Sequence, residues 1–173
     1  LDKYIAQNFE KTRLISDLYF KTLENFYEIS FINAAHWLMP RKTVESVGGF
    51  NPYYFHYSED IEYVNRVKFH RKKIILVPES RAVHDGKQQL NKVDYSIYAD
   101  LTIETNILNP NLSNAFHSEK KSLQQSMIKA ALTGNLQSLK KLYGKYRKIS
   151  AEKKTLTDLA AKTKEVGLTF LNL

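Results

Sequence analysis

Apolar residues recur at helical spacing through much of this chain, and two short apolar runs interrupt the pattern. Residues 4–29 predict a helix, because apolar side chains return every three or four positions without Pro or Gly. Residues 31–39 (FINAAHWLM) form a compact apolar run closed by Pro40, which predicts a buried strand. Residues 72–78 (KKIILVP) predict a second strand that ends at Pro78.

The segment between the two predicted strands is predicted to form a short helix, a turn and a second helix. Residues 40–47 predict one or two helical turns, and the pair Gly48–Gly49 supplies the backbone freedom for a sharp turn. Asn51–Pro52 is predicted to continue as a turn. Ser58 is predicted to cap a helix that ends near His70. That helix has an acidic first turn and one apolar stripe, which consist of Glu59, Asp60 and Glu62, and of Ile61, Val64 and Val67.

From residue 92 onward the pattern is helical. Helices are predicted over 93–108, over 118–132, from the cap Asn135 onward, and over about 150–167. Since strand, helix and strand precede these helices, the fold class is α/β and helix-rich. We predict a division into a first part, 1–91, and an α-helical extension, 92–173.

Composition and charge limit the classes of protein to which this chain can belong. The chain has 173 residues, of which 43% are hydrophobic, enough for a core. It has no Cys, which excludes disulfides and thiolate metal sites and fits a cytoplasmic protein. No apolar run approaches a membrane span, and the first residues do not resemble a signal peptide. The net charge of +8 is concentrated in residues 117–154, which hold 10 basic and 2 acidic side chains.

This basic segment, 117–154, has two interpretations that the sequence leaves open. An apolar stripe bordered by Lys and Arg is typical of a helix that lies peripherally on an anionic membrane. The same stripe is typical of a helix packed on its neighbours with Lys at the rim. Nucleic-acid binding is not expected, because the aromatic residues lie in the stripe rather than among exposed basic residues. The stripe consists of Leu136, Leu139, Leu142, Tyr143, Tyr146 and Ile149.

Residues 31–84 carry an ordered series of motifs. An apolar run is followed by an Arg, a helix, Gly-Gly-Phe-Asn, an aromatic residue, Glu-Asp, an Arg, a strand ending in Val-Pro, and Val-x-His. The series consists of Arg41, Gly48, Gly49, Phe50, Asn51, Phe55, Glu59, Asp60, Arg66, Val77, Pro78, Val83 and His84. The segment therefore resembles the second, acceptor-side half of the catalytic domain of family 2 glycosyltransferases, which have the GT-A fold.

The resemblance implies transfer of a sugar, with inversion, from a nucleotide-sugar donor to an acceptor hydroxyl, in cell-surface polysaccharide or glycolipid synthesis in bacteria. It makes Asp60 the base that takes the hydroxyl proton, with Glu59 holding the acceptor or orienting the loop. It places Phe55 and Tyr57 against the acceptor, since sugars stack on aromatic rings. It also implies that His84 contacts Mn²⁺ or Mg²⁺ bound with the donor diphosphate.

Each of these assignments has a structural alternative. Acidic residues in a first helical turn commonly just offset the helix dipole. Aromatic residues before a helix are commonly core residues, and His84 has the alternative of a surface histidine beside Asp85. For Asp60, the helix dipole favours the ionised carboxylate while burial favours the protonated one, and the sequence does not decide between them.

The chain departs from the family in lacking an Asp-x-Asp motif and a strand-rich segment before residue 31. We therefore expect a C-terminal fragment that lacks the donor-binding half and is inactive alone. The alternative is a non-catalytic module, derived from a transferase, that forms homo-oligomers or docks on a membrane. As an enzyme it would have a nucleotide-sugar donor and a sugar or lipid-linked acceptor, and would act in the cytoplasm or at the inner face of the membrane.

Overall fold

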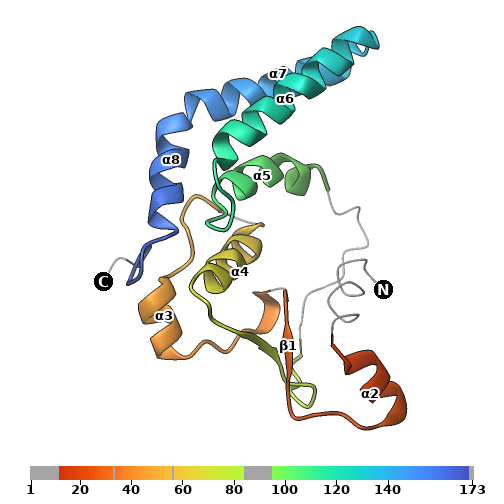
Figure 1. Cartoon of the computed structure of the whole chain (residues 1–173), viewed down its shortest axis with the longest axis vertical. Helices are drawn as coiled ribbons and strands as arrows, with labels where there is room; N and C mark the ends of the chain where they lie inside the picture. The colour runs from red at the N-terminus through yellow and green to blue at the C-terminus, as the bar shows by residue number, and fades with distance from the viewer. Residues whose placement is uncertain (1–11, 33, 56, 84–94, 172–173) are drawn as a thin grey trace.

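The computed structural model describes residues 12–32, 34–55, 57–83 and 95–171. Within them the chain is mostly helical and has one small two-stranded sheet (Figure 1). The elements in chain order are α2 (Leu14–Phe20), β1 (Tyr27–Ile29), the 3₁₀ helix η1 (Ala34–His36), α3 (Arg41–Val47), α4 (Glu59–Phe69), β2 (Ile74–Leu76), α5 (Tyr95–Ile107), α6 (Ala115–Leu132), α7 (Leu136–Ala151) and α8 (Lys153–Lys162). This agrees with the predicted helix-rich α/β class.

The helix predicted over residues 4–29 ends at Phe20, and its last residues form a strand of the sheet instead. β1 and β2 pair antiparallel, with Tyr27 opposite Leu76 and Ile29 opposite Ile74. Residues 27–29 were expected to be helical, but Tyr27 and Ile29 point into the core while Glu28 between them is exposed, which is the period of a strand. Three residues are too few to show that period within a longer helical pattern.

The predicted strand over 31–39 is also wrong, because its centre forms the single 3₁₀ turn η1. Two of its apolar residues instead pack against a core that includes α4. Trp37 and Met39 contact a small core made by Val47 and by Tyr63 of α4. An apolar run without alternation does not distinguish a strand from an irregular buried segment.

Contacts cross the predicted division between 1–91 and 92–173. Tyr54, from the loop before α4, joins the largest apolar cluster together with residues of α5, α6, α7 and α8. That cluster consists of Tyr54, Ile107, Leu108, Phe116, Leu123, Ile149 and Leu156. The two-domain division stays a prediction, but Tyr54 connects the first part to the main cluster of the second.

The C-terminal segment passes directly over the Gly48–Gly49 turn. Gly49 N–H donates to Thr169 O at 2.8 Å, and Gly167 N–H donates to Ser46 O at 3.1 Å. Gly48 has φ +89°, and a Cβ at this position would lie 2.1 Å from Thr169 O. The glycines therefore serve both the turn and the close approach of a second backbone.

α6 and α7 form a helical hairpin, called the α6–α7 hairpin below, that projects from one end of the molecule (Figure 1). Asn135 caps α7 as predicted, since its Oδ1 accepts the N–H of Ser138 at 3.0 Å. Leu142 and Tyr146 pack on the main core, and Ile149 is buried in it. Core packing is thus confirmed for these three residues of the stripe. No described helix has the length and apolar character needed to cross a bilayer.

Candidate active site

The loop of residues 50–58 leads to α4, and two of its tyrosines fix it to the helical part. Tyr53 Oη donates to Glu152 Oε2 at 2.9 Å, and Tyr54 Oη donates to Thr105 Oγ1 at 3.3 Å. Both bonds join residues far apart in sequence. The approach to the acidic pair is therefore held from the side of the helical extension.

The same loop contains a turn and a strained step. Asn51 Oδ1 accepts the N–H of Tyr53 at 3.0 Å, which confirms the turn predicted at Asn51–Pro52. Tyr57 and Ser58 have φ of 68° and 67°, a left-handed conformation that costs about 1–2 kcal/mol for each residue. Ser58 occupies the position before α4 but makes no side-chain cap bond, so its predicted capping role is wrong.

Asp60 takes over part of the capping. Its Oδ1 accepts the N–H of Ile61 at 2.7 Å, which satisfies a free donor of the first turn. The side chain is half-buried. Burial raises the pKa of Asp60, and the neighbouring charge of Glu59 raises it further, while the backbone N–H groups of Ile61 and Ala34 oppose the shift. The effect of burial on the pKa of Asp60 is therefore larger than the opposing effect of the backbone N–H groups.

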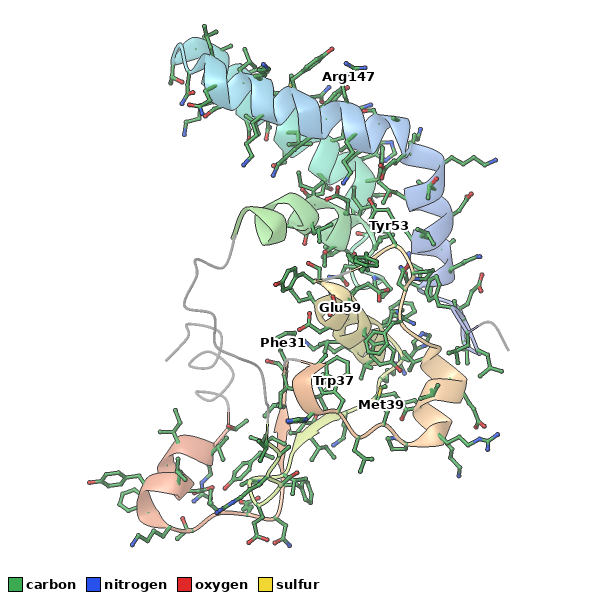
Figure 2. The ribbon with its side chains drawn as sticks, turned by 180° about the vertical axis from the view of Figure 1, so that it is seen from behind. Phe31, Trp37, Met39, Tyr53, Glu59 and Arg147 are labelled. Carbon is green, nitrogen blue, oxygen red and sulfur yellow. The ribbon has the colours of Figure 1, made fainter. Side chains whose placement is uncertain are left out.

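Glu59 begins α4 next to Asp60 (Figure 2). Its Oε2 is buried and has no hydrogen-bond partner among the described residues. A carboxylate oxygen withdrawn from water without a donor is unfavourable, so this atom has an unmet capacity to accept a hydrogen bond. It is the feature of the pair that best suits contact with a hydroxyl group.

The two predicted acceptor-binding residues differ in environment. Phe55 is fully exposed, although it lies beside the buried Tyr54. Tyr57 is half-buried and lies two residues before the acidic pair. Phe55 therefore has no role in the core of the described structure, whereas Tyr53 and Tyr54 are structural. Tyr57, Glu59 and Asp60 lie within four consecutive residues, so their proximity follows from the sequence itself.

The predicted metal contact, His84, lies outside the described residues. Within those residues, no group of three or more His, Cys, Asp or Glu side chains could hold a metal ion. The described residues therefore supply no three-ligand group for Mn²⁺ or Mg²⁺. We derive no step through a metal, and the role of His84 stays a prediction.

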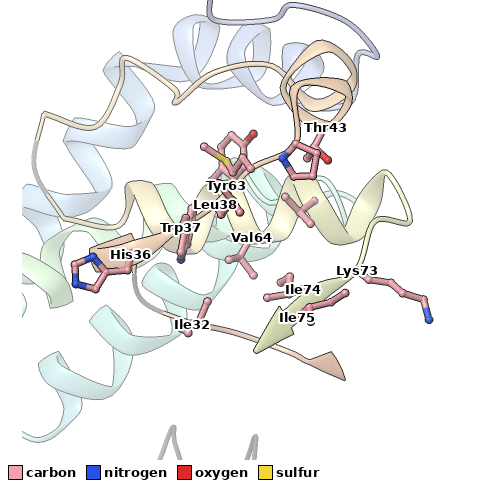
Figure 3. A pocket seen from close by; sticks show the side chains of 13 residues that line it. Ile32, His36, Trp37, Leu38, Thr43, Tyr63, Val64, Lys73, Ile74 and Ile75 are labelled. Atoms are coloured by element: carbon pink, nitrogen blue, oxygen red, sulfur yellow. The ribbon is translucent and has the colours of Figure 1, made fainter. Parts of the chain in front are cut away.

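A cavity of about 150 Å³ lies beside α4 (Figure 3). Its walls are mainly apolar and come from η1, the segment after it, α4 and β2, including Trp37, Leu38, Tyr63, Val64 and Ile74. Leu38 at its rim is almost fully exposed. None of the predicted site residues that the structure describes lines this cavity, although Asp60 shares the face of α4 that carries Val64 and Val67.

Sequence reasoning placed Arg66 in the motif series without giving it a task. The structure shows a fully buried guanidinium whose Nη1 donates to Val47 O at 2.7 Å and whose Nη2 donates to Gly49 O at 2.6 Å. It lies 4.8 Å from the ring centre of Tyr63 and 5.0 Å from that of Phe170. Arg66 therefore joins α4 to the glycine turn and to the C-terminal segment.

The partner of this buried cation is Glu62, one turn earlier on α4. Glu62 Oε1 lies 2.9 Å from Arg66 Nε, and both side chains are inaccessible to water. Burial raises the pKa of Glu62, and the charge of Arg66 opposes that shift. The i, i+4 spacing of Glu and Arg beside the apolar Tyr63 and Val67 is the signal that identifies such a pair.

Searches of protein-family models, curated proteins and solved structures found no match to this chain.

Proposed function

We propose that this chain is the acceptor-side part of a family 2 glycosyltransferase with a GT-A fold. The enzyme transfers a sugar from a nucleotide-sugar to an acceptor hydroxyl, with inversion, and Asp60 is the general base. The observation that carries the proposal is a carboxyl group that is half-buried, fixed through Oδ1 to the first turn of α4, and raised in pKa.

The chemistry follows from that position. The acceptor oxygen forms a bond to the anomeric carbon while the bond from that carbon to the donor phosphate breaks. The nucleoside diphosphate leaves with the electron pair, and the hydroxyl proton passes to Asp60. A carboxylate whose pKa is raised is the better base for this transfer, provided that the working pH still leaves it ionised.

Two neighbours support the assignment. Glu59 Oε2 is buried without a donor, so a second hydroxyl of the acceptor is a suitable partner for it. Phe55 presents a fully exposed ring on the same loop, and such a ring stacks on the apolar C–H face of a sugar.

Arg66 supports the motif series in a different way. It holds the carbonyls of Val47 and Gly49 from within α4, so the glycine turn and the helix that starts with the acidic pair move as one unit. A base must keep a fixed distance to its target, and a rigid turn and helix provide that. The spacing between Gly-Gly, Glu-Asp and Arg thus has a physical reason.

The test is Asp60→Asn in the full-length protein, assayed against nucleotide-sugars with Mn²⁺ present. Asn keeps the oxygen that accepts the Ile61 N–H but cannot take a proton, so turnover should fall by about 10²–10⁴-fold. Asp158→Asn, on the exposed surface of α8, is the matched control and should leave turnover unchanged. Turnover by Asp60→Asn equal to that of this control would sink the proposal.

Thermal unfolding of Asp60→Asn over a series of pH values shows whether a loss of turnover comes from lost catalysis or from lost folding. Since the folded-state pKa of Asp60 is raised, the folded protein binds its proton more readily than the unfolded chain does. The carboxyl therefore lowers the free energy of unfolding as pH rises through the interval between the two pKa values. Asp60→Asn should raise the midpoint of thermal unfolding at pH 7, with no gain below the unfolded pKa of about 3.9.

A further inference from the structure

Four large apolar side chains are exposed near the free end of the α6–α7 hairpin. They are Ile128 and Leu132 on α6, 61% and 83% exposed, and Leu136 and Tyr143 on α7, 75% and 51% exposed. We call this set the hairpin tip. Ile128 and Leu132 are four residues apart, and Leu136 and Tyr143 seven apart, so each pair shares one face of its helix.

The hairpin does not need these side chains for its own packing. Leu123 and Ala130 of α6 are buried, as is Ile149 of α7, and Leu142 and Tyr146 add to the main core. In α6, Ile128 lies two residues before the buried Ala130, on the opposite side of the helix. The hairpin tip therefore lies away from the seam on α6 and forms the exposed edge of the apolar stripe on α7.

The charges around the hairpin tip all have one sign. Residues 120–151 contain eight Lys and Arg and no Asp or Glu. Lys129, Lys140, Lys141 and Arg147 are exposed and make no ion pair among the described residues. Lys140 lies one turn after Leu136, so this cation and the apolar residue share one face. Arg147 lies on α7 far from the acidic site at Glu59 (Figure 2).

The basic residues closer to the core have protein partners instead. Lys148 Nζ lies 2.7 Å from Glu104 Oε1, and Lys120 Nζ lies 5.0 Å from the ring centre of Tyr146. Positive charge without a protein counter-charge is thus concentrated on the outer faces and the free end of the hairpin, where the exposed apolar residues are.

We propose that the hairpin tip docks on the surface of an anionic lipid bilayer. Its Leu and Ile side chains enter the headgroup boundary, and the surrounding Lys and Arg bind the lipid phosphates. A second copy of the chain is a poor partner, because its tip carries the same dense positive charge. A projecting convex end enters a deformable lipid interface, whereas a folded protein must offer a matching groove.

The binding test uses the whole chain and vesicles of phosphatidylcholine with and without about one third phosphatidylglycerol, and it requires no sugar transfer. We expect sedimentation with the anionic vesicles only, and weaker binding at high salt. Each Lys near an anionic surface contributes about 1 kcal/mol, so Lys129→Glu with Lys140→Glu should weaken binding by at least about 10-fold.

Two control variants make the same kinds of substitution outside the hairpin tip, so they test whether the position of the residues determines binding. Lys154→Glu with Lys162→Glu makes the same change in net charge on α8 and should bind far more tightly than the tip charge variant. Leu132→Ser with Leu136→Ser should weaken binding about 10-fold, whereas Val166→Ser, which removes an equally exposed apolar residue elsewhere, should not. Equal effects of tip and control substitutions would overturn the proposal.

A reporter checks insertion independently of variant stability. The chain has no Cys, so Leu136→Cys and Leu112→Cys each give one site for an environment-sensitive fluorophore. Anionic vesicles should shift the emission to the blue at position 136 and leave position 112 unchanged. No shift at 136 would overturn the proposal. So would a dimer without vesicle binding that Leu132→Ser with Leu136→Ser dissociates, which would show a contact between copies.

Discussion

Two helical regions of this protein treat charge in opposite ways. α4 buries both members of an ion pair, Glu62 and Arg66, and Arg66 holds the glycine turn. The outer part of the α6–α7 hairpin keeps its cations in water and exposes apolar side chains as well. The first arrangement stabilises one internal geometry, and the second leaves a surface suited to a partner. The location of a charge therefore tells more about its role than the total of +8.

Among the substitutions that test this comparison, Arg66→Met should cause the largest loss of stability. It leaves Glu62 buried without its counter-charge and removes the donors to Val47 O and Gly49 O, so the free energy of unfolding should fall by about 3–5 kcal/mol. Urea unfolding measures the change. Glu62→Gln added to Arg66→Met should restore part of the loss, because it removes the unpaired charge.

The matched control is Arg41→Met. Arg41 and Glu45 have the same spacing as Glu62 and Arg66 and a distance of 2.7 Å, but the side chain of Arg41 is 91% exposed. A surface pair contributes about 0–1 kcal/mol. If Arg41→Met and Arg66→Met cost the same, burial is not what gives the α4 pair its importance.

Gly48→Ala should have the next largest effect. The new Cβ meets Thr169 O, and the backbone at φ +89° strains a residue with a side chain, so about 2–3 kcal/mol of stability should be lost. The same substitution should release residues 167–171, which amide exchange at Gly49 N–H detects, since this group donates to Thr169 O.

Gly134→Ala is the control for backbone strain alone. Gly134 has φ +66° in the turn of the hairpin, but a Cβ there meets nothing within 4 Å. We expect a loss of about 1 kcal/mol from the left-handed backbone and no change in exchange at Gly49. An equal loss at both glycines would show that the close approach of residue 169 contributes nothing.

The hairpin should give the smallest effect on stability. Leu132→Ser with Leu136→Ser should change the free energy of unfolding by less than about 0.5 kcal/mol, because both side chains are already in water. Leu156→Ala, at a buried position of the main core, should cost about 2–5 kcal/mol. A large loss from the tip substitutions would mean that the hairpin tip packs against protein.

Local patterns predicted the parts of the molecule that local physics determines. The turn at Asn51, the start of α4 at Glu59, the cap Asn135 and the order of the later helices all depend on neighbours a few residues away. The acidic pair could be singled out for the same reason, from its place in a motif series and in a first helical turn.

Contacts between residues far apart in the sequence determined the rest of the fold, and no local sequence pattern predicts such contacts. Residues 27–29 became a strand because a partner strand 45–49 residues later offered hydrogen bonds and a core contact for Tyr27 and Ile29. The task of Arg66 depends on backbone carbonyls 17 and 19 residues away. The raised pKa of Asp60 depends on how tightly other segments exclude water from it. Burial is a property of the assembled fold, and it determined which charged side chains stabilise the interior and which face solvent.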